Sequence, residues 1–225
     1  MELKLVIFDL DNTLWDFETN SREALIELYE TLDINHDFQK FHRNYVEINY
    51  RYWREYEQGK ITKNELRYGR FFEAFNDIGF HDRKEIEKVA NRYLEISPFK
   101  KAVFENTYSV LDFIASKYKM AIITNGFNEV VEMKVKNCQF DKYFDLVQTS
   151  EDAGVQKPNP RIFQKVLDFF NLSNDEAIMI GDNLQTDIEG ANSVNMRSIL
   201  FDPKNEHVNY TNEKISNLIE LKNIL

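Results

Sequence analysis

Two carboxylates separated by a single residue follow a run of apolar residues near the start of the chain. The run occupies residues 5–8 after Lys4, and Asp9, Leu10 and Asp11 come directly after it. Apolar and β-branched residues without a turn signal predict a buried strand. Side chains two apart in a strand point to the same side, so both carboxyl groups should emerge together. Such acids repel each other and favour a shared cation or proton, although a strand end with an Asx turn at Asn12 explains them equally well.

Two further groups of polar residues stand at predicted strand ends or in loops. Thr124, Asn125 and Gly126 end an apolar run and precede a helical pattern. Backbone N–H groups and the helix dipole suit an anion at such a position, but the same residues are common in ordinary turns. Lys157 lies in a loop with two prolines, which stiffen its backbone and favour a positioned charge. A solvated loop lysine is the simpler interpretation.

A second pair of acids follows the apolar run at residues 177–180. Asp182 comes directly after this predicted strand, and Asp187 lies in the first turn of the next predicted helix. Asp187 could be a charge that complements a helix terminus, but Asp182 has no comparably simple explanation. Because the carboxyl ends of parallel strands meet at one edge of a sheet, we expect all these groups to share one cavity.

The hydrophobic pattern divides the chain into a helical segment and an alternating segment. Residues 15–98 carry four amphipathic helical patterns, with glycines at positions 59 and 79 between them. From about residue 100 strands alternate with helices, which predicts a parallel sheet with right-handed crossovers. The first strand belongs to that sheet. We therefore expect a core domain of residues 1–14 and 99–225, with residues 15–98 inserted as a four-helix cap that could act as a lid. Residues 214–225 are expected to form a terminal helix.

Composition excludes several classes of protein. The 225 residues carry a formal net charge of −10, which argues against binding to nucleic acid or to an anionic membrane. A phosphorylated small molecule stays compatible with this charge, because a bound divalent metal would reverse the local potential. Cys138 is the single cysteine, so no intramolecular disulfide can form. No apolar stretch is long enough to span a bilayer, and the first strand leaves no room for a signal peptide. We expect a cytoplasmic protein.

The four motifs in this order resemble those of the haloacid dehalogenase superfamily phosphohydrolases. The matching residues are Asp9-Leu10-Asp11-Asn12-Thr13, Thr124, Lys157, and Gly181-Asp182-Asn183 with Asp187. The resemblance spans the whole chain and implies a Rossmann-like three-layer α/β core with a parallel sheet and an inserted helical cap. It also implies Mg²⁺-dependent hydrolysis of phosphomonoesters through an aspartyl-phosphate.

The resemblance implies a role for each motif residue. Asp9 would be the nucleophile and Asp11 the general acid and base. The remaining implied roles are Mg²⁺ ligation by Asp9, the Asp11 backbone carbonyl and Asp182, support of the metal by Asp187 and Asn183, and phosphate binding by Thr124, Asn125 and Lys157. Dehalogenases lack an acid two residues after the nucleophile, since halide leaves without a proton. Asp11 therefore argues against dehalogenation.

Four longer stretches resemble the bacterial noncanonical pyrimidine 5′-nucleotidases. They are residues 11–17, 56–62, 124–127 and 150–158. This resemblance implies a nucleoside monophosphate as the substrate, with a sugar-phosphate or phosphoglycolate phosphatase, a phosphomutase and a catalytically silent binding protein as alternatives. Trp53, Arg67 and Arg70 flank a turn of the cap and could stack on a base or meet a ribose or phosphate. Packing inside the cap is the alternative for each of them.

Overall fold

The chain forms two compact units in the computed structural model, which describes residues 2–31, 34 and 36–225. One unit comprises Met1–Phe17 and Lys101–Leu225, and the other comprises Glu18–Lys100. No helix in this described part of the chain has both the length and the apolarity needed to cross a membrane. The role of the helical unit as a cap stays a prediction.

A six-stranded parallel sheet forms the centre of the first unit, as the alternating pattern predicted. Its strands, in spatial order, are β3 (Leu146–Thr149), β2 (Lys119–Thr124), β1 (Leu5–Phe8), β4 (Ala177–Gly181), β5 (Arg197–Phe201) and β6 (Lys214–Ile215). Strand β1 lies between β2 and β4 and is parallel to both. The chain adds strands on one side of β1 and then returns to the other side at β4. Ligands in such sheets bind beside this point, at the carboxyl ends of the strands.

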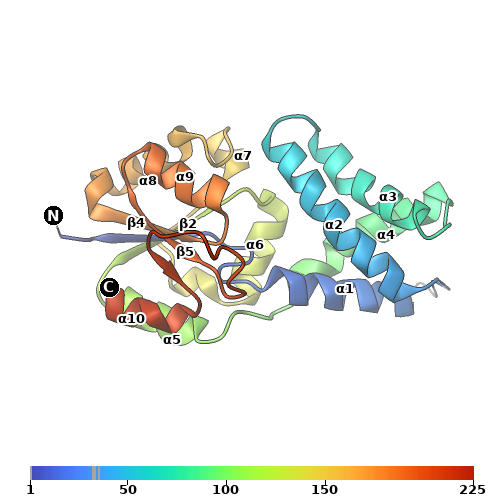
Figure 1. Cartoon of the computed structure of the whole chain (residues 1–225), viewed down its shortest axis with the longest axis horizontal. Coiled ribbons are helices and arrows are strands. Elements are labelled where there is room, and N and C mark those ends of the chain that lie inside the picture. The colour runs from blue at the N-terminus through green and yellow to red at the C-terminus, as the bar shows by residue number, and fades with distance from the viewer. Residues whose placement is uncertain (1, 32–33, 35) are drawn as a thin grey trace. The chain divides into compact units, whose positions relative to one another are not determined.

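Helices cover both faces of the sheet, which confirms the three-layer α/β fold (Figure 1). The helices of this unit are α5 (Thr107–Ala115), α6 (Asn128–Asn137), α7 (Ser150–Ala153), α8 (Pro160–Phe170), α9 (Glu189–Ser193) and α10 (Leu221–Ile224), with short turns η3 (Phe140–Lys142), η4 (Asn174–Glu176), η5 (Leu184–Ile188) and η6 (Leu218–Glu220). Successive residues of β1 pack on opposite faces. Val6 and Phe8 join the core with α5, α6 and α10, whereas Leu5 and Ile7 join the core with α8 and α9. Strand β1 is buried on both faces as a result.

The second unit is helical and has its own core. Its elements are α2 (Phe38–Glu57), η1 (Glu65–Gly69), α3 (Arg70–Asn76), α4 (Arg83–Ile96), η2 (Ser97–Phe99) and α1 (Phe17–Thr31), whose first residue belongs to the sheet unit. Aromatic side chains such as Phe41 and Phe75, whose ring centroids are 4.4 Å apart, fill this core. Residues 62–65 form a capping box, because Thr62 and Glu65 each accept a hydrogen bond from the backbone N–H of the other.

The predicted terminal helix over residues 214–225 is wrong for its first four residues. Residues 214–215 form strand β6, which pairs with Leu200 and Phe201 of β5, and helical structure begins only at Leu218. The apolar residues Ile215, Leu218 and Leu221 have the spacing of a helix, so the sequence pattern does not separate the two cases. Pairing with the free edge of β5 decides the conformation of the first two residues.

Candidate active site

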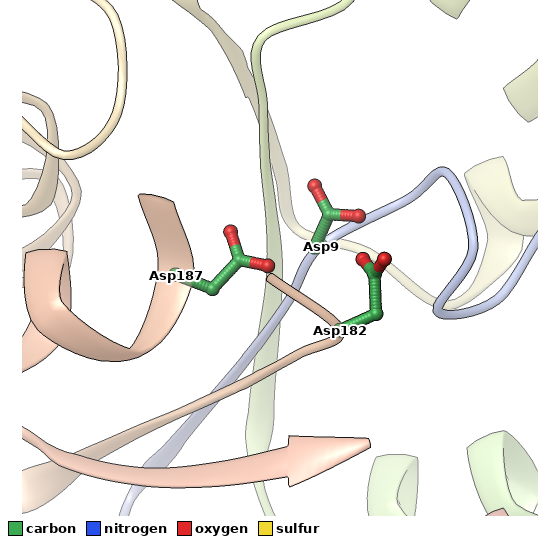
Figure 2. A group of neighbouring side chains, drawn as sticks. All are labelled: Asp9, Asp182 and Asp187. Carbon is green, nitrogen blue, oxygen red and sulfur yellow. The ribbon is translucent and has the colours of Figure 1, made fainter. Parts of the chain in front are cut away.

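Three acidic side chains converge at the carboxyl ends of β1 and β4. Asp9 follows β1, Asp182 follows β4, and Asp187 comes from η5 just beyond. One carboxylate oxygen from each lies within 4.8 Å of the other two. Figure 2 shows the three carboxylates, carried by separate segments, directed toward a common space. The sequence prediction that these acids meet at one edge of the sheet agrees with this geometry.

The ammonium group of Lys157 joins two of these acids. Its Nζ donates to Asp9 Oδ1 at 2.5 Å, to Asp187 Oδ1 at 2.6 Å and to the carbonyl of Ile123 at 2.8 Å. The side chain is 2% exposed, so Lys157 is not a solvated loop lysine. Burial by itself would lower the pKa of Lys157, but Asp187 and Asp9 outweigh it and raise the pKa above the usual value. The lysine is therefore held charged against both acids.

Burial raises the pKa values of the two acids that follow the strands. For Asp9, burial and the neighbouring Asp187 raise the pKa against the opposing effect of Lys157. For Asp182, burial and the charges of Asp9 and Asp187 raise the pKa well above its usual value. Three acids share the charge of one ammonium here, so the site favours a further positive charge.

The donor set fits a hard divalent cation. All three groups are carboxylates, their oxygens converge, and Mg²⁺ prefers oxygen ligands. Both carboxylate oxygens of Asp187 already accept hydrogen bonds within the protein. Its Oδ1 accepts from Lys157, and its Oδ2 accepts from the backbone N–H of Asn183 at 3.0 Å. This arrangement suits Asp187 to the supporting role and leaves Asp9 and Asp182 better placed to bind a metal.

Two further residues, Asn183 and Thr13, contact the acid cluster around Asp182. The side chain of Asn183 caps η5 by accepting from the backbone N–H groups of Gln185 and Thr186 at 2.9 and 3.1 Å. Asn183 therefore contacts the acid cluster through the hydrogen bond from its backbone N–H to Asp187, while its side chain is used in the helix cap. Thr13, which the sequence interpretation named only as part of the first motif, is fully buried and donates its hydroxyl to Asp182 Oδ1 at 3.3 Å.

The loop after β2 carries the predicted phosphate-binding residues. Thr124 is 2% exposed and its hydroxyl accepts the backbone N–H of Gly126 at 3.0 Å. The Asn125 side chain forms a reciprocal pair with Lys157, accepting its backbone N–H at 2.8 Å and donating to its carbonyl at 3.1 Å. Asn125 therefore fixes the backbone that carries Lys157. A Cβ at position 126 would lie 2.8 Å from Val131, so only glycine allows this close approach.

Sequence reasoning missed a lysine at this site. Lys134 of α6 donates its Nζ to Asp11 Oδ1 at 2.5 Å, and its side chain is only 5% exposed. The same ammonium lies 3.8 Å from the centroid of the Trp15 ring. The helical pattern of α6 is apolar at Val131 and Val135, and Lys134 lies beside them on the buried face. A lysine on a buried helix face was the signal available in the sequence.

The predicted substrate residues of the cap lie within the helical unit. Trp53 is half-buried and packs edge-on against Tyr56, with ring centroids 6.0 Å apart. Arg67 is half-buried and donates to Asn91 at 3.3 Å.

Arg70 is 3% exposed and donates to the buried Asn49 at 2.6 Å. Packing within the unit explains Arg70 best, and the contribution of all three residues to substrate binding stays a prediction.

A parallel α/β sheet with a converging acid and lysine cluster beside its central strand defines a class of hydrolase. The model of the haloacid dehalogenase-like hydrolase family matches residues 3–195, and the chain belongs to this family. The recognition based on the four motifs is therefore confirmed.

Individual relatives cover most of the chain. A pyrimidine 5′-nucleotidase of Escherichia coli is 32% identical over 84% of this chain and 82% of its own length. A glyceraldehyde 3-phosphate phosphatase of Pyrococcus furiosus is 30% identical over 88% of this chain and 80% of its own. A crystal structure of the HAD-hydrolase YfnB from Bacillus subtilis, described as bound to magnesium, superposes with a TM-score of 0.91 at 24% identity. The superposition covers 100% of this chain and 99% of the YfnB chain, so the two proteins share the same fold.

Proposed function

We propose that this protein is a Mg²⁺-dependent phosphomonoester hydrolase that works through an aspartyl-phosphate. The observation that carries the proposal is the contact of the Lys157 ammonium with the carboxylate of Asp9. Asp9 lies beside Asp182 in space and precedes Asp11 by two residues in the sequence. In this proposal Asp9 is the nucleophile, Asp11 is the proton donor and Lys157 supplies positive charge. The relatives that hydrolyse phosphate esters and the magnesium of the matching structure support it.

In the proposed reaction, the free carboxylate oxygen of Asp9 attacks phosphorus and the bond to the leaving oxygen breaks. Asp11 gives its proton to the leaving alkoxide, so an alcohol departs. Water then attacks the phosphorus, Asp11 takes a proton from it, and the bond from phosphorus to Asp9 breaks to release inorganic phosphate. The Lys157 ammonium, already on Asp9 Oδ1, orients the nucleophile and stabilises negative charge on the phosphoryl oxygens.

Two groups would hold the phosphoryl oxygens and the metal. The Thr124 hydroxyl and the backbone N–H of Asn125 lie at the end of β2 and would bind phosphoryl oxygens. Asp9, Asp182 and the backbone carbonyl of Asp11 would hold Mg²⁺, with Asp187 and Asn183 in support. The bound ion would neutralise phosphoryl charge and keep the ester in line with Asp9.

We propose a pyrimidine nucleoside monophosphate, canonical or modified, as the substrate. The four stretches shared with the bacterial pyrimidine 5′-nucleotidases and the relative from Escherichia coli support this choice. Such metabolites occur in the cytoplasm, where we place the enzyme. A phosphorylated sugar or triose is the second candidate, and the relative from Pyrococcus furiosus favours it.

A substrate panel with EDTA controls tests the proposal. Purified protein is incubated with UMP, dUMP, dTMP, glyceraldehyde 3-phosphate, phosphoglycolate and p-nitrophenyl phosphate, each with Mg²⁺ or with EDTA, and phosphate release is measured. We expect Mg²⁺-dependent release with the highest kcat/KM for a pyrimidine nucleotide. A preference for the triose phosphate would select the second candidate, and no release from any compound would contradict hydrolase activity.

A further inference from the structure

The ion pair between Lys134 and Asp11 connects helix α6 with the turn that follows β1. Lys134 Nζ lies 2.5 Å from Asp11 Oδ1, and the aliphatic part and ammonium of this lysine are almost fully buried. The ammonium rests on the ring of Trp15 at 3.8 Å and lies 5.8 Å from that of Phe17. A charge buried this far from water needs a partner, and the side chain is held in one place by the ring beneath it.

The turn itself brings Asp11 and Trp15 to the same lysine. Asn12 adopts a left-handed conformation with φ of 62°, and its backbone N–H donates to the carbonyl of Trp15 at 2.8 Å. The backbone N–H of Trp15 donates in turn to the carbonyl of Leu10 at 2.9 Å. This tight turn brings the Trp15 ring and the Asp11 carboxylate to the same ammonium group. The indole ring and the carboxylate together form a receptor for one ammonium group.

The two oxygens of the Asp11 carboxylate face different surroundings. Oδ1 is engaged by Lys134, whereas Oδ2 lies 3.7 Å from the position that a Cβ on Gly126 would occupy. That position is also 3.2 Å from the Thr124 hydroxyl oxygen. Oδ2 therefore faces the loop proposed to bind the phosphoryl group. One oxygen is anchored, and the other is presented to the space where the leaving group would be.

We propose that Lys134 is a positioning residue that orients Asp11, so that Oδ2 exchanges the proton with the leaving alcohol and with water. The inference rests on the proposed function and extends it to a residue outside the four motifs. Lys134 forms and breaks no bond: it holds Oδ1 while the proton passes through Oδ2. A displacement of about 1 Å at a reacting group can lower a rate by roughly 100-fold, so losing this anchor should slow the steps that depend on Asp11.

Leaving-group dependence separates this role from a purely structural one. A nucleotide releases an alkoxide that needs a proton, whereas p-nitrophenolate departs without one. The ratio kcat/KM covers steps up to phosphoryl transfer, so it reports the proton donor for a nucleotide and not for p-nitrophenyl phosphate. For Lys134→Met we expect kcat/KM to fall by roughly 100-fold with UMP and by less than about threefold with p-nitrophenyl phosphate, with KM for UMP little changed.

Further variants complete the experiment. Lys134→Arg keeps the cation and should recover part of the lost rate, and Lys136→Met, an exposed lysine on the same helix, should match wild type. In an Asp11→Asn background, Lys134→Met should change kcat/KM for UMP by less than about twofold. The carboxylate that Lys134 orients is already absent there, and effects of coupled residues are not additive. Thermal unfolding confirms folding, and Lys134→Gln replaces the methionine variant if that one is unfolded.

The outcomes distinguish the two proposals. Equal losses for both substrates, or a Lys134→Met effect that persists in the Asp11→Asn background, would overturn the positioning role while leaving the hydrolase proposal intact. A wild type that cleaves neither ester would overturn both.

Discussion

At the scale of single residues, Asp9 differs from Asp187, because Lys157 holds Oδ1 of Asp9 whereas both carboxylate oxygens of Asp187 accept hydrogen bonds. Lys157 holds Oδ1, and the same lysine is tied to Asp187 and to the Ile123 carbonyl. Burial of Asp9 raises its pKa, so keeping it ionised costs folding free energy in the absence of a metal. The proposed reaction would account for this cost, because it requires Asp9 as a carboxylate nucleophile.

Replacing Asp9 by asparagine should therefore separate activity from stability. We expect Asp9→Asn to lower turnover by at least about 1,000-fold, because an amide cannot form the phosphoenzyme. Its melting temperature should equal or exceed that of wild type, because one buried charge is removed and Lys157 still forms its ion pair with Asp187. Phosphate release and thermal unfolding are measured on the same preparation. Asp141→Asn, at an exposed position, is the control, and undiminished turnover in Asp9→Asn would rule out the covalent mechanism.

At the scale of elements, the junction between β4 and η5 depends on a glycine. A Cβ on Gly181 would lie 2.5 Å from Cγ of Asp187, so any side chain there displaces the carboxylate that pairs with Lys157 and belongs to the proposed metal site. Gly154 is a useful contrast, because it has a φ of 70° but open space around its missing Cβ.

We expect Gly181→Ala to destabilise the fold by about 1–3 kcal/mol and also to abolish most activity. Gly154→Ala should cost roughly 1–2 kcal/mol, because alanine is strained in the left-handed region, yet should keep its kcat. Denaturant unfolding and UMP hydrolysis compare the two variants. Equal retention of activity in both would show that the close approach at Gly181 does not matter for the site.

The loop after β5 is held by the carboxylate of Asp202, which lies outside the candidate active site. Asp202 is 5% exposed and accepts backbone N–H groups from Glu206 and His207 at 2.8 and 3.0 Å. Lys214 of β6 also donates to it at 3.3 Å. Burial opposes ionisation, but these donors outweigh it and lower the pKa of Asp202 below its usual value.

A lowered pKa in the folded state makes this contribution dependent on pH. The stabilisation by Asp202 should be complete above the unfolded pKa of about 4 and should be lost as the pH falls through the lower folded value. We expect Asp202→Asn to unfold at a lower temperature than wild type at pH 7, with the difference shrinking as the solution is acidified below pH ~4. Melting curves between neutral and acidic pH test this. A difference that is independent of pH would contradict an ionic role.

At the scale of the whole molecule, a metal that binds only the folded protein should raise its stability. Three carboxylates meet only when β1, β4 and η5 are assembled, so the unfolded chain has no equivalent site. With Mg²⁺ at 100 times its Kd, linkage adds about 2.7 kcal/mol. For a chain of this size the melting temperature should rise by roughly 5–10 °C.

Asp182→Asn should abolish most of this Mg²⁺-dependent rise while leaving a folded protein. EDTA should reverse the rise in wild type and have little effect on the variant. Differential scanning fluorimetry across a Mg²⁺ series measures both. If Asp182→Asn responded to Mg²⁺ as wild type does, the metal would bind elsewhere.

The local pattern of the sequence was enough to predict the elements of the core and the residues at their ends. Apolar runs specify strands buried on both faces, and polar residues directly after them must lie at the edge of the sheet. Because that edge is common to all parallel strands, Asp9, Asp182 and Lys157 were predicted to share one site without knowledge of the packing.

Contacts between distant segments were decided only by the tertiary structure. Lys134 and Asp11 are 123 positions apart, and Thr13 and Asp182 are 169 apart. Helical periodicity places a residue on a face but does not say which side chain of another element it meets. The burial of Arg70 and the choice of strand over helix at residues 214–215 likewise depend on neighbouring elements. Periodicity follows from backbone geometry alone, whereas these pairings follow from how the packed elements fit together.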